Sequence, residues 1–178
     1  IGMTTHIEAG EQPDELIGTN LSAKDTLRLK VSSHVTFAGH TAYHVSPILN
    51  SGPLPPTVGM KTTYAIMLEV RSFSNTLQNV VMTTALPTQA HWEQKTFPQD
   101  VRMAFDTGTQ DLRWEIGEIP AGTGIFSPAL TAAFQISILP SEFDRNKVLE
   151  LVKDIELTGI DSFTGQHIEM HIGPLTTA

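Results

Sequence analysis

Cysteine is absent from this chain of 178 residues. Without thiols, the chain forms no disulfide, no thiolate zinc site and no cysteine nucleophile. No apolar run approaches the roughly 18 residues that a membrane-spanning helix needs. Aromatic residues are also few, at 7%, with two Trp and two Tyr. That scarcity argues against the aromatic-lined cleft of a glycoside hydrolase.

Positive charge is scarce as well. Eleven Lys and Arg stand against 19 Asp and Glu, which gives a formal net charge of −8. Proteins that hold nucleic acid or anionic lipid do so with clustered cations, so we expect neither as a partner. The apolar content of 40% is ordinary for a folded domain. A chain of this length buries roughly 70% of its unfolded surface, which is enough for a hydrophobic core.

The chain changes character near residue 24. Residues 1–23 are polar, rich in Gly, Thr, Glu and Asp, and contain Pro13, so we expect an arm or linker there. Residues 24–178 are expected to form the folded domain. We therefore predict two parts, a short N-terminal arm and one domain.

The first strong pattern is an alternation of apolar and polar residues over residues 27–37. Period-2 alternation is the signature of a half-buried strand, so we predict one strand here. The apolar positions are odd, and His34, His40 and His44 stand at even positions. We expect these histidines, and likewise His167 and His171 near the end of the chain, to face away from the core.

Further segments with the same period follow, separated by turns rich in Pro, Gly and Asn. We predict eight or nine strands in all, and the turn at Ser74 and Asn75 predicts a β-hairpin between residues 62–72 and 77–86. No segment has a helical period of helical length. Short strands at regular spacing favour an all-β sandwich or barrel. The predicted core consists of Leu29, Val31, Tyr64, Ile66, Leu68, Val70, Trp114, Ile116, Phe134, Ile136, Ile155, Leu157, Ile168 and Met170.

Four stretches of the chain carry a family resemblance: VGMKTTYAIMLEVRSFSN at residues 58–75, LQNVVMTTALP at 77–87, LRWEIGEIPAGTG at 112–124 and AAFQISILP at 132–140. With them, residues 25–178 resemble the immunoglobulin-like conserved-repeat domains of prokaryotic cell-surface proteins, of the type found in candidate phyla. The resemblance implies an all-β, immunoglobulin-like antiparallel β-sandwich of eight or nine strands outside the cytoplasm. It brings no catalytic residues with it.

Candidate sites for chemistry are weak. The sequence has no G-x-S-x-G nucleophile elbow, and we expect no enzymatic activity. His40 and His44, four residues apart on one strand, would be separated by ~13 Å, too far to share a zinc ion unless a second strand contributes. We expect no cofactor and no metal. Calcium is the alternative, because four acidic residues lie in or near turns: Asp106, Asp111, Glu118 and Asp161.

These features favour a non-catalytic, extracellular structural module of a cell-surface protein. We expect it to associate with other copies or domains of the same protein, as a tandem array or as a filament or sheath subunit. We expect no nucleic acid or small-molecule substrate as a partner, and contact with a membrane only through regions outside this chain. The predicted strand-donation segment is Leu27, Leu29, Val31, Val35 and Phe37. The alternative is an adhesin or a glycan- or protein-binding module that uses the aromatic residues near its loops, Phe73, Trp92, Phe97 and Phe163.

Overall fold

The computed structural model describes residues 2–8 and 22–177. The chain divides into two compact units, Ile1–Val31 and Ser32–Ala178. The described residues form strands and one short 3₁₀ turn, Glu142–Asp144, with no α-helix among them. None of their helical segments has the length and apolar character needed to cross a membrane.

The strands range from two residues in β13 to 11 residues in β4. Two belong to the first unit and eleven to the second. In chain order they are β1 (Gly2–Glu8), β2 (Ser22–Arg28), β3 (Val35–Ala42), β4 (Thr62–Ser72), β5 (Leu77–Ala85), β6 (Ala90–Phe97), β7 (Met103–Phe105), β8 (Asp111–Ile119), β9 (Leu130–Ile138), β10 (Glu150–Val152), β11 (Ile155–Asp161), β12 (His167–Ile172) and β13 (Leu175–Thr176).

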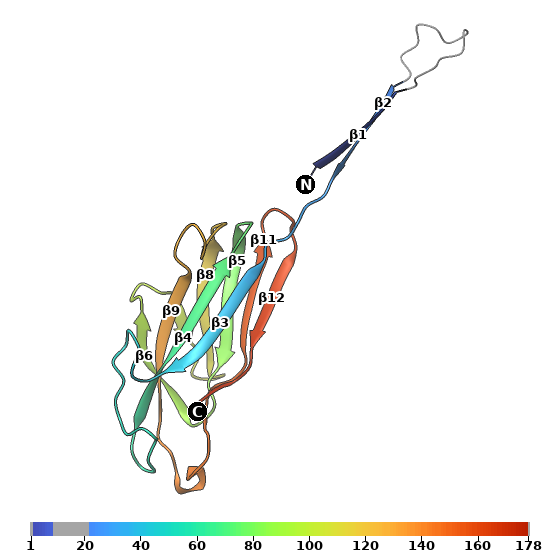
Figure 1. The fold of residues 1–178 in the computed structure, drawn as a ribbon. Helices are drawn as coiled ribbons and strands as arrows, with labels where there is room; N and C mark the ends of the chain where they lie inside the picture. Colours follow the sequence, from blue (N-terminus) through green and yellow to red (C-terminus); the bar gives the residue numbers. More distant parts are fainter. Residues whose placement is uncertain (1, 9–21, 178) are drawn as a thin grey trace, which may run out of the picture. The chain divides into compact units, whose positions relative to one another are not determined.

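The second unit is a sandwich of two antiparallel sheets (Figure 1). One sheet has five strands in the order β12-β11-β5-β8-β7, and the other has four in the order β3-β4-β9-β6. A short pair, β10 with β13, lies beside them in the same unit. This arrangement confirms the predicted immunoglobulin-like antiparallel β-sandwich.

The core lies between the two sheets and follows the period of the strands. Tyr64, Ile66, Leu68 and Val70 of β4 each expose 2% or less of their surface. Trp114 of β8 exposes 4%, which confirms its predicted place in the core. The other confirmed core residues are Phe134, Ile136, Ile155 and Leu157. Ile116, Ile168 and Met170 are only half-buried and pack against the edge of this cluster.

Two predicted core residues are wrong. Leu29 and Val31 expose 54% and 58% of their surface. The single strand predicted over residues 27–37 is two strands, because β2 ends at Arg28 and β3 begins at Val35. β2 pairs with β1 in the first unit, whereas β3 belongs to the sandwich. Residues 24–31 therefore belong with the arm, and the boundary between the units falls after Val31.

Ser33 supplies the physical reason for the interruption. Its backbone N–H donates to the carboxylate of Asp161 at 2.7 Å. Its hydroxyl accepts the backbone N–H groups of Ser74 and Asn75. Because the backbone N–H of Ser33 is bonded to a side chain and not to a neighbouring strand, the ladder of β3 begins only after it, at Val35.

The predicted hairpin between residues 62–72 and 77–86 is also wrong. β4 pairs with β3 and β9, whereas β5 pairs with β8 and β11 in the other sheet. The connection therefore crosses between the sheets. The hydroxyl of Ser72 donates to the backbone oxygen of Asn75 at 2.8 Å, which fixes the crossing.

Candidate assembly surface

The first unit contains an antiparallel hairpin of β1 and β2. Its register runs from Gly2 opposite Arg28 to Glu8 opposite Ser22, so odd-numbered residues of both strands share one face. Ile7 and Leu27 stand on this face and expose 65% and 52% of their surface. An isolated two-stranded hairpin is marginally stable in water. Ile7 and Leu27 lie near opposite ends of this face, with Thr5 and Asp25 between them, and a partner that covered either exposed apolar residue would stabilise the hairpin.

Residues 27–31, which we name the donor segment, continue this pattern beyond β2. Leu27, Leu29 and Val31 are all more than half exposed. Arg28 and Lys30 stand between them and are exposed as well. The segment thus has one apolar side and one basic side when it is extended.

The other two residues of the predicted strand-donation segment lie in the sandwich. Val35 is opposite Ser72 of β4, and Phe37 is opposite Val70. Val35 is buried, and Phe37 packs partly buried against the core. The structure therefore separates the five predicted residues into three that are exposed and two that complete the four-stranded sheet of their own domain.

Asp161 fixes the start of the sandwich. It is fully buried. One carboxylate oxygen accepts the backbone N–H of Ser33 and the side-chain amide of Asn75, at 2.7 and 2.8 Å. The other oxygen accepts the N–H groups of Phe163 and Thr164, at 2.9 and 3.0 Å. Burial alone would raise the pKa of this carboxyl, but the hydrogen bonds outweigh burial and lower the pKa to about 2.

The sandwich has four edge strands, and they differ in how open they are to another strand. β7 has three residues. β6 carries a register irregularity between Trp92 and Thr96, with Gln94 at φ 56°, and such bulges protect edges. β3 and β12 are regular over eight and six residues. Strand addition therefore has two regular edges available to it.

The outer face of the β11–β12 pair brings two carboxylates and a histidine together. Glu156 stands opposite His171 across the β11–β12 pair. The ligand atoms of Glu156, Glu169 and His171 all lie within 4.8 Å of one another. Nε2 of His171 is 2.9 Å from a carboxylate oxygen of Glu169. By residue type, this group of described residues could hold a divalent metal. The sequence did not reveal it, because the pairing of β11 with β12 brings the residues together.

Two of the calcium candidates stabilise turns instead. The carboxylate of Asp106 accepts the N–H groups of Gly108 and Thr109, at 2.7 and 3.3 Å. Asp161 has both oxygens occupied, as described above. Asp111 and Glu118 lie on β8. Within residues 2–8 and 22–177, these four carboxylates do not form a metal-ligating group.

The histidines lie as predicted. His34, His40, His44, His167 and His171 are all exposed. They face away from the core because they occupy the outward positions of alternating strands or lie in loops.

The predicted aromatic candidates are dispersed over several elements. Phe97 and Phe163 expose 46% and 51% of their surface, the first at the end of β6 and the second in the β11–β12 turn. Trp92 is half-buried against Phe105, with ring centroids 5.5 Å apart. Phe73 is also half-buried. The alternative adhesin function would depend on Phe97 and Phe163, and it stays a prediction.

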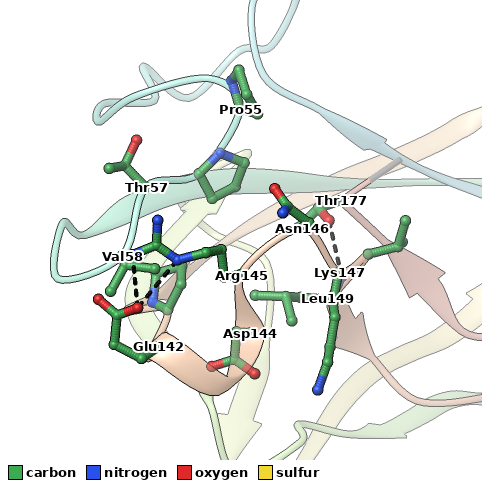
Figure 2. A pocket seen from close by; sticks show the side chains of 13 residues that line it. Pro55, Thr57, Val58, Glu142, Asp144, Arg145, Asn146, Lys147, Leu149 and Thr177 are labelled. Atoms are coloured by element: carbon green, nitrogen blue, oxygen red, sulfur yellow. Dashed lines mark hydrogen bonds and ion pairs between the residues drawn. The ribbon is translucent and has the colours of Figure 1, made fainter.

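A shallow depression of about 540 Å³ lies between residues 55–58 and residues 140–149 (Figure 2). Figure 2 shows the ion pair of Arg145 with Glu142 on one side, at 2.7 Å. Thr177 lies on another side and accepts the backbone N–H of Leu149 at 3.0 Å. The described residues that line the depression include no aromatic side chain. It therefore offers no stacking platform for a sugar ring.

The comparisons with known proteins show the fold. No family model matches the chain. No curated protein matches it either. Among solved structures, it is similar to a variant of BcpA, the major pilin subunit of Bacillus cereus, with a TM-score of 0.50 and 12% identity over 98% of this chain and 47% of that chain. The chain thus spans about half of that pilin's length.

Two further solved structures are similar in the same way. SpaD, the full-length major pilin of Corynebacterium diphtheriae, has a TM-score of 0.48 and 10% identity over 80% of this chain and 35% of that chain. The RrgA Jo.In complex has a TM-score of 0.47 and 10% identity over 76% of each chain. At these identities the likeness concerns architecture. The two sheets and the likeness to the BcpA variant together define the class of the fold, the immunoglobulin-like β-sandwich.

Proposed function

We propose that this chain is a non-catalytic structural module of a bacterial cell-surface protein and that it associates with other copies of itself. In this proposal the module belongs to the conserved-repeat domains that its motifs resemble. Copies join as a tandem array or as subunits of a filament or sheath. The sandwich contributes stiffness, and the arm contributes the contact between copies.

The observation that carries the proposal is the exposed apolar side of the arm. Ile7, Leu27, Leu29 and Val31 expose between 52% and 65% of their surface. A hairpin of two strands buries too little apolar surface to offset the conformational entropy that ordering it costs. Contact with a second copy would bury these side chains and stabilise the hairpin. The likeness to a pilin subunit supports the same reading, because a stiff sandwich suits an extracellular assembly.

We expect no catalysis on the outer faces of the sheets, because they are open to solvent. One polar cluster on the described outer face, Glu156, Glu169 and His171, lies on such a surface. A catalytic site gains its electrostatic strength from excluding water. An open strand surface does not provide that condition.

The experiment is a measurement of mass against concentration. Multi-angle light scattering of the full chain, from micromolar to millimolar concentration, should show a weight-average mass that rises above 19.4 kDa. Negative-stain microscopy of the concentrated sample should show chains of beads or filaments. A mass that stays at the monomer value over the whole range would contradict the proposal.

A further inference from the structure

We propose that the edge strand β12 in one copy receives the donor segment of a second copy as an additional strand of the five-stranded sheet. This inference depends on the proposed self-association and names the two surfaces that meet. The donor segment is residues 27–31, and the acceptor is residues 168–172 of β12. Within the described sheet, β12 hydrogen-bonds to β11 and stands at the edge.

The two segments have the same alternation over five residues each. The donor segment reads Leu-Arg-Leu-Lys-Val, and the acceptor reads Ile-Glu-Met-His-Ile. Paired in either direction, three apolar residues of one segment stand beside three apolar residues of the other. The two basic residues then stand beside Glu169 and His171. Directly opposed side chains in a sheet lie about 5 Å apart and interact, so the pattern favours the pairing on both faces.

The apolar face of the pairing extends the existing core. Ile168, Met170 and Ile172 are half-buried and pack at its margin. The side chain of Ile172 lies beside Gly39 of β3, where a Cβ would approach it to 3.2 Å. An added strand would cover the outer edges of these side chains with Leu27, Leu29 and Val31. The exposed apolar surface of both copies would then be removed from water.

The polar face of the pairing is complementary in charge. Arg28 and Lys30 are the donor's cations. Glu169 lies on β12 itself, and Glu156 lies behind it on β11, opposite His171. In the parallel pairing Arg28 stands beside Glu169, and in the antiparallel pairing Lys30 does. Both directions therefore bring a cation next to a carboxylate, which favours correct partners over random ones.

The other three edges fit the donor segment less well. β7 is shorter than the donor segment, with three residues. β6 is interrupted by its register irregularity. β3 is regular, but its outward residues Thr36, Ala38 and His40 carry no carboxylate. The carboxylate behind them, Glu69 of β4 opposite Ala38, is already paired with Arg71 at 2.7 Å. Among the described edges, β12 is the one that matches the donor segment in length, alternation and charge.

Charge reversal on each side tests the assignment. Glu169→Lys should place like charges together and weaken the self-association of the full chain by about ten-fold or more. The double variant Arg28→Glu, Lys30→Glu should do the same from the donor side. An equimolar mixture of the two variants should associate again, because each variant then meets an opposite charge. Sedimentation velocity at fixed ionic strength measures all four samples, including the unaltered chain.

Matched controls separate this contact from general charge effects. Glu115→Lys changes an exposed carboxylate on β8, on the same outer face but away from the edge, and should leave the association unchanged. Glu169→Gln removes the charge without reversing it and should weaken association less than Glu169→Lys does. This second substitution keeps the test valid if the lysine variant folds poorly.

The outcomes distinguish the two proposals. If the unaltered chain associates and the Glu169 and donor variants associate equally well, the assignment of β12 is wrong while the proposed function stands. Association that EDTA abolishes and charge reversal leaves intact would mean a metal bridge at Glu156, Glu169 and His171, which also overturns the strand contact. An unaltered chain that never associates would overturn the proposed function itself.

Discussion

The side-chain amide of Asn75 donates a hydrogen bond of 2.8 Å to the buried carboxylate of Asp161, which lies 86 positions further along the chain. The same oxygen accepts the backbone N–H of Ser33. One carboxylate thus joins the start of the sandwich, the β4–β5 connection and the β11–β12 turn. These three segments are far apart in the sequence, so the contact closes that end of the fold.

Asp161 makes stability depend on pH in the acid range. Its pKa in the folded protein is about 2, below its ordinary value of 3.8. The stabilisation is present above the ordinary value and is lost as the pH falls through the range from 3.8 to about 2. We expect a loss of roughly 2 kcal/mol in the free energy of unfolding across that range. Urea denaturation at a series of pH values measures it.

Asp161→Asn should lower the stability near pH 7 and flatten this acid dependence. Asp106→Asn is the matched control, because Asp106 also caps a turn with its carboxylate but is exposed. That control should retain most of the acid dependence. If Asp161→Asn keeps the full slope in the acid range, the dependence arises from another group.

Trp114 is a core residue with 4% of its surface exposed. Trp114→Ala should therefore lower the free energy of unfolding by about 3–5 kcal/mol, through lost apolar burial and the cavity left behind. Phe143→Ala removes another aromatic ring, but that side chain is 85% exposed. Its effect should stay within about 0.5 kcal/mol. A melting temperature unchanged by Trp114→Ala would refute the core assignment.

Tyr64 buries its hydroxyl without a hydrogen-bond partner among the described residues. Burial, and secondarily the nearby Tyr43, raise the pKa of Tyr64 to about 12. Tyr64→Phe should leave the stability at pH 7 unchanged or raise it by up to about 1 kcal/mol, since an unpaired buried group is removed. The unaltered chain should lose stability as the pH rises from 10 to about 12, and the variant should lose less.

Tyr43→Phe is the comparison for that prediction. The hydroxyl of Tyr43 donates to the backbone oxygen of Gly52. Removing this bond should lower the free energy of unfolding by about 1 kcal/mol. Thermal melts of both variants at pH 7 measure the two effects. An equal loss of stability in Tyr64→Phe and Tyr43→Phe would contradict the difference between a hydroxyl without a partner and a hydrogen-bonded one.

Gly52 lies at φ +102°, where a Cβ would be 2.3 Å from the backbone oxygen of Lys61 and 2.7 Å from Cα of Thr62. Because backbone atoms cannot yield easily, Gly52→Ala should destabilise the chain by about 2–4 kcal/mol. Gly59 lies at φ +73°, and a Cβ added there would meet no atom within 4 Å. Gly59→Ala should cost about 1 kcal/mol from backbone strain alone. Equal costs in denaturant titrations would contradict the steric argument.

The alternation of side chains predicted much of the sandwich. Period 2 identified the inward residues of β4 and β11 and the burial of Trp114, because core packing requires one apolar face per strand. The same period could not tell Leu29 and Val31 from core residues. Alternation specifies which side chains share a face, but it does not specify what covers that face.

The sequence could not predict which strands pair or how the connections run between the sheets, for a related reason. The β4–β5 turn carries hairpin residues, yet β4 and β5 pair in different sheets, and Asn75 in that turn is hydrogen-bonded to Ser33 and Asp161. Glu156 and Glu169 come together only through the β11–β12 register. Such contacts depend on pairs of residues far apart in the chain, and local pattern contains no information about them.

Leu27 provides the most direct test of whether the apolar side of the arm joins one copy to another. Leu27→Lys places a charge on the apolar side of the donor segment, whereas Thr26→Lys places the same charge on the opposite face of β2. Light scattering over a range of concentrations should show self-association in the unaltered chain and in Thr26→Lys, and a loss of about ten-fold or more in association for Leu27→Lys. Equal association of all three proteins, or monomers throughout, would contradict the account.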